Sequence, residues 1–157
     1  MARSGADLAL LMLAGFRVLV DRGRVELAAR GYEDVRPMHD FALHAILDGA
    51  DTASALGRRM SVTKQAAAET IGTLEARGYV EREADPNDRR RIRLRVTGLG
   101  ASLLREGELV FDGLRQDWEA QVGPARVAEL EAALRRLVGD EIIRPGASGS
   151  TVESVAD

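Results

Sequence analysis

Three consecutive arginines, Arg89, Arg90 and Arg91, directly follow the turn signal of Asp85-Pro86-Asn87-Asp88. Guanidinium groups at the tip of a tight turn are suited to the minor groove of DNA, because the negative potential of that groove attracts them. We expect Asp88 to hold one of these arginines through a bidentate ion pair. A solvated hairpin tip is the alternative interpretation of the same residues.

A second polar group, Thr63, Lys64 and Gln65, stands at the beginning of a segment whose alanines and spaced aliphatic residues favour a helix. These side chains are donor and acceptor types that contact base edges and phosphates. Arg58 and Arg59, a few residues earlier, add two cations suited to phosphate contacts. Together these residues indicate a nucleic-acid-binding surface.

No group of residues forms a catalytic or metal site in the sequence. The segment 98–103 reads GLGASL and resembles the beginning of a dinucleotide fingerprint, but its third glycine position holds Leu103 and no βαβ unit surrounds it. The chain has no cysteine, which excludes disulfides, cysteine-ligated zinc and thiol-based redox sensing. His39 and His44 lie about 140° apart on a helix and do not share a face. We therefore expect no enzymatic activity, no cofactor and no metal.

The elements that must position these residues follow from apolar periodicity and from helix-ending signals. Asp7 is expected to cap the first helix and Gly31 to end it, while Pro37 fits the first turn of the second. Met60-Ser61-Val62 forms the turn between two helices, with Ser61 where many such turns have glycine. The expected helices span 7–30, 37–48, 52–59, 63–77, 97–122 and 124–143, and the expected strands span 79–83 and 92–96.

This order predicts a mostly α fold with a small β-hairpin wing (α+β), in which a winged helix-turn-helix is flanked by N- and C-terminal dimerisation helices. We divide the chain into an N-terminal helix of the dimerisation region (1–36), a winged helix-turn-helix DNA-binding domain (37–97), C-terminal dimerisation helices (98–144) and a disordered tail (145–157). The last helix is expected to bury Val127, Leu130, Leu134, Leu137 and Val138.

The most apolar run, residues 8–20, has 13 residues and contains Arg17. A membrane-spanning helix needs about 20 apolar residues, so no membrane segment is expected and the protein should be cytoplasmic. The first half of the helix that contains this run is apolar on nearly all sides. A single small domain can hardly bury such a helix, so a partner subunit would cover it.

Charge is distributed unevenly along the chain, whose net charge is −3. Residues 51–97 carry 10 basic and 7 acidic side chains and residues 98–157 carry 6 basic and 11 acidic ones, which gives local net charges of +3 and −5. Local charge steers a protein toward phosphate more than the total does, so the positive segment is the expected DNA-binding region.

The chain resembles the multiple antibiotic resistance regulator (MarR) family over nearly its whole length. The segments that carry this resemblance are TASALGRRMSVTKQAAAETIGTLEARGYVER and DPNDRRRIRLRVTGLG. The most specific part is the D-x-R element of the wing, Asp88-Arg89-Arg90, followed by Val96-Thr97 at the strand exit.

The resemblance implies a homodimer that binds double-stranded DNA at a pseudo-palindromic operator. Many members of the family are repressors released by small aromatic or phenolic ligands. The resemblance also implies that Arg90 is the wing-tip arginine and Asp88 its positioning partner. The sign of regulation depends on where the operator lies relative to a promoter. Residues placed by position near a ligand pocket are Phe16, Arg17, His39 and Trp118, for which packing or surface roles are the alternative. A winged-helix protein-interaction module without specific DNA binding is the alternative function.

Overall fold

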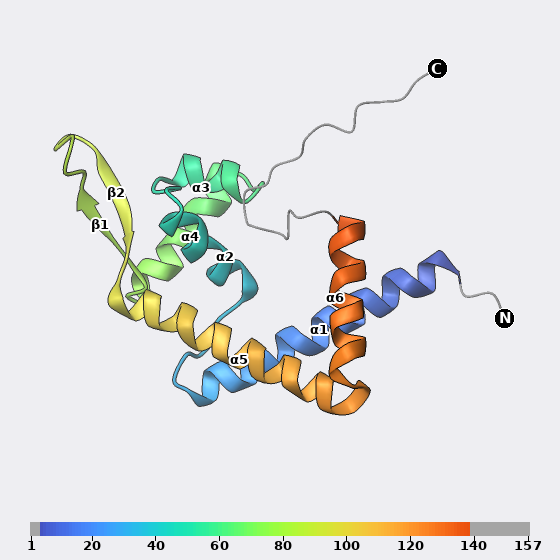
Figure 1. Ribbon diagram of the computed structural model, residues 1–157. Helices are drawn as coiled ribbons and strands as arrows, with labels where there is room; N and C mark the ends of the chain where they lie inside the picture. The colour runs from blue at the N-terminus through green and yellow to red at the C-terminus, as the bar shows by residue number, and fades with distance from the viewer. Residues whose placement is uncertain (1–3, 139–157) are drawn as a thin grey trace, which may run out of the picture.

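The computed structural model describes residues 4–138 as six helices and one two-stranded antiparallel sheet (Figure 1). This arrangement confirms the predicted α+β winged-helix fold. The tail of 145–157 and the end of the last expected helix lie outside the described residues. In chain order the elements are α1 (Gly5–Ala29), α2 (Pro37–Leu47), α3 (Ala53–Arg59), α4 (Lys64–Ala76), β1 (Val80–Ala84), β2 (Ile92–Val96), α5 (Gly98–Val122) and α6 (Pro124–Val138).

Hydroxyl side chains cap the N-termini of four helices. Thr52, Thr63 and Thr97 each accept the backbone N–H of the residue three positions later, at the beginnings of α3, α4 and α5. The prediction that Asp7 caps α1 is wrong. Ser4 is the N-cap, and Asp7 completes a capping box by accepting the Ser4 N–H at 3.0 Å while Ser4 Oγ accepts the Asp7 N–H at 3.2 Å.

The winged lobe, which we define as residues 37–97, has an aliphatic core. Leu43, Leu56, Ile71 and Leu74 are almost completely buried, and Leu103 of α5 closes the same cluster. Complete burial of one such side chain contributes about 1.5–3 kcal/mol to the free energy of unfolding. The core therefore fixes α2, α3 and α4 relative to one another.

A close approach and a left-handed residue form the turn between α3 and α4. A Cβ atom at Gly57 would lie 3.1 Å from the Val62 carbonyl oxygen, so a larger residue would push the helices apart. Ser61 has φ of 54°, the left-handed conformation that glycine adopts more easily, which explains why serine is unusual in such a turn.

The wing is the hairpin of β1 and β2, in which Glu81 lies opposite Arg95 and Glu83 lies opposite Arg93. Two contacts join its base to the beginning of α5: the Thr97 N–H donates to the Tyr79 carbonyl at 3.0 Å, and the Thr97 hydroxyl donates to the Gly78 carbonyl at 2.6 Å. The strand exit is thereby tied to the chain segment that follows α4.

Helix α5 continues from the wing to α6 and packs along α1 (Figure 1). Two ion pairs, Arg22–Asp117 at 2.5 Å and Arg30–Glu106 at 2.6 Å, join α1 to α5. Among the described residues, no helix has both the length and the apolar character needed to cross a membrane.

The terminal helices, α1 and α6, leave apolar side chains exposed. The expected burial of the apolar residues of α6 is largely wrong within one chain. Val127 is buried and Leu134 is half-buried, but Leu130 and Leu137 are 47% and 77% exposed. The side chain of Val138 lies outside the description. On α1 the exposed apolar residues are Leu8, Leu10, Leu11, Met12, Leu13, Phe16, Val18 and Val25.

Candidate nucleic-acid interface

Helix α4 presents a polar, exposed face at its N-terminal end. Ala67, Ile71 and Leu74 point into the core, while Lys64 and Gln65 are exposed. Thr63 lies just before the helix, and its Oγ1 accepts the Ala66 N–H at 3.0 Å. Capping therefore uses one lone pair of this hydroxyl and leaves its proton for another acceptor.

Two exposed residues on this face, Ala68 and Glu69, were missed by the sequence interpretation. They follow Lys64 and Gln65 at a spacing of four, so helical periodicity was the signal that could have found them. A glutamate on such a face is an acceptor suited to the amino group of cytosine. The exposed face thus continues one turn beyond the residues first singled out.

Short-range hydrogen bonds shape the tip of the wing. The Asp85 N–H donates to the Arg91 carbonyl at 2.8 Å, and the Asn87 N–H donates to Asp85 Oδ1 at 2.8 Å. The expected bidentate pair between Asp88 and an arginine is not present: Asp88 Oδ1 accepts the backbone N–H of Arg90 at 3.0 Å. Asp88 thus orients the Arg90 backbone and not a guanidinium.

The three arginines at the tip differ in their partners. Arg91 donates from Nη2 to Asp51 Oδ1 at 2.9 Å, and its Nε lies 3.8 Å from Asp85 Oδ2. The side chains of Arg89 and Arg90 are exposed and have no ion pair within the described part of the chain. The two arginines without carboxylate partners are the ones able to reach an external anion.

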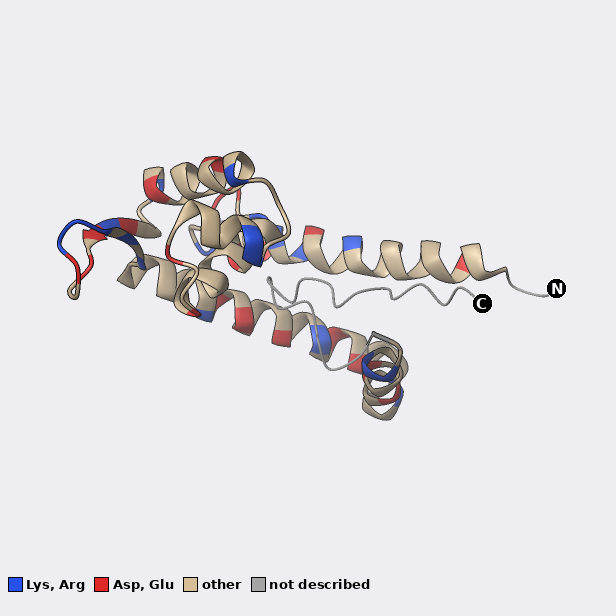
Figure 2. Cartoon of the chain, turned by 90° about the horizontal axis from the view of Figure 1, so that it is seen from above, with Lys and Arg blue, Asp and Glu red and all other residues tan. Residues whose placement is uncertain are grey.

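Glutamates neutralise the arginines within the strands of the wing. Arg93 pairs with Glu83 at 2.6 Å, and Arg95 pairs with Glu81 and with Glu83, the latter at 3.0 Å. Hydrogen bonding to Glu81 raises the pKa of Arg95. Figure 2 shows basic and acidic segments side by side along the hairpin. The positive charge of the two arginines on β2 is thus largely compensated, and within the wing the arginines without ion pairs lie at the tip.

A further ion pair joins the wing to α4. Arg82 Nε donates to Glu75 Oε1 at 2.8 Å and Arg82 Nη2 donates to Glu75 Oε2 at 3.2 Å. Two parallel bonds between a guanidinium and a carboxylate constrain direction as well as distance. The orientation of β1 is therefore coupled to the C-terminal half of α4.

Arg58 and Arg59 are the last two residues of α3. Arg58 is exposed, and Arg59 donates from Nη2 to Asp48 Oδ2 at 3.1 Å. This pair attaches the end of α3 to the end of α2. The two arginines lie just before the turn that leads into α4.

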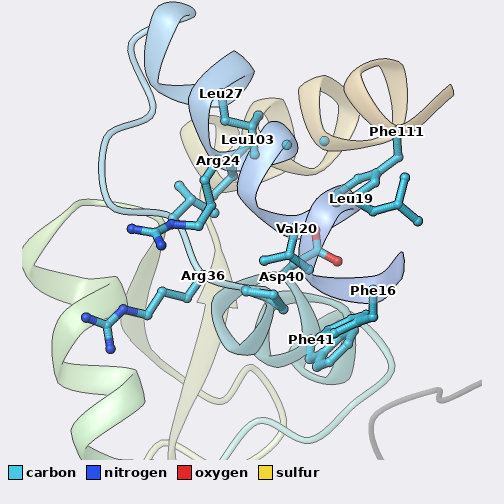
Figure 3. Close-up of a pocket in the computed structure, with 14 residues that line it drawn as sticks. Phe16, Leu19, Val20, Arg24, Leu27, Arg36, Asp40, Phe41, Leu103 and Phe111 are labelled. Atoms are coloured by element: carbon cyan, nitrogen blue, oxygen red, sulfur yellow. The ribbon is translucent and has the colours of Figure 1, made fainter. Parts of the chain in front are cut away.

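A cavity of about 190 Å³ lies between α1, α2 and α5 (Figure 3). Its walls are mostly apolar, with Leu19, Val20, Leu27, Leu103 and Phe111 among the lining residues. Of the four residues placed near a pocket by sequence position, Phe16 lines this cavity, while Arg17, His39 and Trp118 do not. Trp118 instead packs toward Gly15 of α1, where an added Cβ would be 3.7 Å from its ring.

Three charged residues complete the lining of the cavity. The side chains of Arg24 and Arg36 extend toward the same side in Figure 3, and Asp40 lies between the apolar walls. Burial raises the pKa of Asp40, an effect that His44 opposes and Glu108 reinforces. The cavity thus combines an apolar interior with two guanidinium groups on one side.

His39, the residue before Asp40 in α2, is buried. Its Nδ1 accepts the Arg36 backbone N–H at 3.3 Å, which caps the beginning of α2. Burial lowers the pKa of His39, and the nearby charges of Arg77 and Arg36 lower it further. His39 is therefore neutral in the folded protein at neutral pH.

These features define the class of the protein: a helix-turn-helix with a β-hairpin wing, carried on long terminal helices. Residues 34–91 match the sequence model of the MarR family. A putative transcriptional regulatory protein for the hcr operon of Thauera aromatica is 32% identical over 84 residues. That match covers 54% of this chain and about half, 51%, of the relative.

Solved structures agree with this class over most of the chain. Wild-type apo MarR from E. coli has a TM-score of 0.64 at 25% identity, over 83% of this chain and 96% of MarR. A MarR family protein from Bacillus stearothermophilus has a TM-score of 0.67 at 21% identity, over 87% and 96%. A mutant of S. aureus MepR bound to an oligodeoxyribonucleotide has a TM-score of 0.59 at 16% identity, over 83% and 95%. The resemblance seen in the sequence is confirmed: residues 34–91 match the MarR family model, and the fold is that of solved MarR family structures.

Proposed function

We propose that the protein is a homodimeric, sequence-specific DNA-binding transcriptional regulator that represses from a pseudo-palindromic operator. The observation that supports this function best is the position of two exposed groups in one lobe: the polar face at the beginning of α4, and the unpaired arginines at the tip of the adjoining wing. An α-helix fits the major groove, and guanidinium groups favour the narrow minor groove beside it.

In this arrangement Lys64, Gln65 and Thr63 contact bases and phosphates in the major groove, with Ala68 and Glu69 extending the surface. Arg89 and Arg90 enter the flanking minor groove, and Arg58 and Arg59 lie toward the phosphate backbone. The neighbour MepR, whose mutant is bound to an oligodeoxyribonucleotide, is an example of the same fold on DNA. Phosphate contacts of this kind make affinity fall steeply with salt.

Exposed apolar side chains support the dimer. Leu10 and Leu11 of α1 are each 63% exposed, and Leu137 of α6 is 77% exposed. Contiguous apolar surface on terminal helices is typical of an interface between subunits. A two-fold dimer of winged lobes matches two half-sites about ten base pairs apart.

The cavity between α1, α2 and α5 supports release by a small aromatic acid. Phe16 and Phe111 provide aromatic walls, and Arg24 and Arg36 provide cations for a carboxylate. The cavity lies between the terminal helices and the winged lobe. A ligand that binds more tightly to one arrangement of the helices and the lobe than to another would therefore shift the DNA affinity. Titration with benzoate and with neutral benzyl alcohol tests this: the acid should bind more tightly, and an Arg24→Gln/Arg36→Gln variant should lose that preference.

Selection of purified protein on randomised duplex DNA, followed by sequencing at two salt concentrations, tests the main proposal. An enriched inverted repeat whose affinity falls with salt supports a dimeric operator-binding protein. Absence of an enriched sequence, with weak and unspecific retention at low salt, contradicts it. That outcome favours a winged-helix module that docks a protein partner, for which the neutralised strands of the wing are suitable.

A further inference from the structure

The wing is attached to the connection between α2 and α3 at one residue, Asp51. The Leu94 N–H of β2 donates to the Asp51 carbonyl at 2.8 Å, and Arg91 Nη2 donates to Asp51 Oδ1 at 2.9 Å. The Asp51 backbone carbonyl therefore holds the middle of β2, and the Asp51 carboxylate holds Arg91, the residue just before β2.

Arg91 also approaches a second carboxylate. Its Nε lies 3.8 Å from Asp85 Oδ2, and Asp85 Oδ1 is already committed to the turn through the Asn87 N–H. The side chains of Asp51 and Asp85 are only 20% and 12% exposed, whereas that of Arg91 is 52% exposed. Without the guanidinium, two largely buried carboxylates would repel each other across the contact between the wing and the lobe.

The neighbours of Arg91 have the opposite character. Arg89 and Arg90 are exposed without ion pairs in the region that the structure describes, and Asp88 holds only the backbone of Arg90. We propose that the three wing arginines have different roles. Arg91, together with Asp51, is a positioning residue that holds the wing against the α2–α3 connection. Arg89 and Arg90 thereby reach the DNA. Arg91 itself neutralises no phosphate. This inference rests on the proposed DNA-binding function.

Two interpretations of Asp51 predict opposite changes in DNA affinity when Asp51 is replaced by asparagine. If Asp51 only contributes negative charge to the DNA-binding lobe, Asp51→Asn reduces repulsion from phosphate and tightens binding. If Asp51 holds the wing, Asp51→Asn weakens its hold on Arg91 and weakens binding. The direction of the change therefore separates a general electrostatic role from a positioning role.

The experiment compares Arg91→Gln, Asp51→Asn and the double variant with Arg90→Gln, which makes the same chemical change one residue away. Affinity for the selected operator is measured across a salt series. Arg90→Gln should reduce the slope of log affinity against log salt by about 1, because one phosphate contact is lost. Arg91→Gln and Asp51→Asn should each weaken binding, by about fivefold, with the slope unchanged. The double variant should be no weaker than either single one, because both act through one contact.

A second measurement does not depend on DNA. Hydrogen exchange of the free protein should accelerate at the amides of residues 85–94 in Arg91→Gln and Asp51→Asn, but not in Arg90→Gln. Unchanged exchange in both variants overturns the proposal, as does tighter operator binding by Asp51→Asn or a reduced salt slope in Arg91→Gln. If the wild-type protein selects no DNA sequence, the proposed function fails, while the exchange data still decide whether Asp51 and Arg91 hold the wing.

Discussion

The winged lobe and the terminal helices use apolar residues in different ways. In the lobe, Leu43, Leu56 and Leu74 are fully buried within one chain, together with Leu103 of α5. On the terminal helices, residues of the same type such as Leu11 and Leu137 are mostly exposed. Both regions contain aliphatic residues, but within one chain only the lobe has elements on enough sides to cover them.

This difference separates folding from assembly. A closed core makes the stability of the lobe depend on internal packing, where a change of one side chain costs several kcal/mol. An exposed apolar helix gains free energy only when another surface covers it. Substitutions in the lobe should therefore affect unfolding first, and substitutions on α1 should affect association first.

The largest effect is expected for Gly100→Ala, where α5 leaves the wing. A Cβ atom at Gly100 would lie 2.2 Å from the Tyr79 carbonyl oxygen and 2.8 Å from Val96 Cγ1, so the backbone must move. We expect a loss of about 3 kcal/mol or more in the free energy of unfolding, measured by urea denaturation.

Gly72→Ala is the matched control for this substitution, because nothing lies within 4 Å of a Cβ atom at that helical position. It should stabilise the protein by about 0.5–1 kcal/mol, since alanine loses less conformational entropy in a helix. Equal stability of the two alanine variants would contradict the close packing at the base of the wing.

Leu11→Glu tests the other side of the comparison. Leu11 is 63% exposed on α1, so a charge there should leave the lobe folded and shift the protein from dimer to monomer in sedimentation equilibrium. Ile92→Glu is the control, because Ile92 is 60% exposed but lies on the wing. A dimer that persists in Leu11→Glu, or that dissociates equally in both variants, would remove α1 from the interface.

Gln65→Ala changes neither region's packing, because Gln65 is exposed on α4. If Gln65 contacts a base edge, the variant should lose roughly 1–3 kcal/mol of operator binding and accept other bases at one position. Thermal unfolding and the dimer should remain as in the wild-type protein. Repeating the sequence selection with the variant is the measurement, and an identical preferred sequence would exclude Gln65 from base contacts.

The smallest effect concerns pH and is located in the lobe. Because the pKa of His39 is lowered in the folded state, the unfolded chain binds more protons below the ordinary value of 6.5. The free energy of unfolding should therefore fall as pH decreases from 6.5 toward the folded-state pKa, and remain unaffected by His39 above 6.5.

Asp40 acts in the opposite sense. Burial raises the pKa of Asp40 above 3.8. The contribution of Asp40 to the free energy of unfolding is therefore lost as pH rises through its folded-state pKa. Denaturation of the wild-type protein and of His39→Asn at several pH values separates the contribution of His39 from that of Asp40. Asparagine removes the titrating group but keeps an acceptor for the Arg36 N–H. Equal pH dependence of both proteins would show that His39 does not titrate in this way.

Local signals in the sequence were sufficient for most element boundaries. Apolar periodicity, Gly31, Pro37 and the turn signal at 85–88 predicted where the helices and strands begin and end to within about two residues, apart from the end of the last helix, which lies outside the described residues. The N-cap of α1 was missed because Ser4 and Asp7 both suit that position, and the capping box uses both. The burial assigned to α6 was wrong because periodicity identifies an apolar face but not what covers it.

The sequence by itself determined the winged helix-turn-helix, the resemblance to the MarR family and the residues that carry charge to the wing, because these depend on local propensity and on motif spacing. Only the tertiary structure decided which of those charges are available. Asp51 lies 40 positions from Arg91 along the chain yet pairs with it, and strand register places Glu81 and Glu83 against Arg95 and Arg93. The physical reason is that an ion pair depends on distance in space, which a one-dimensional pattern does not contain.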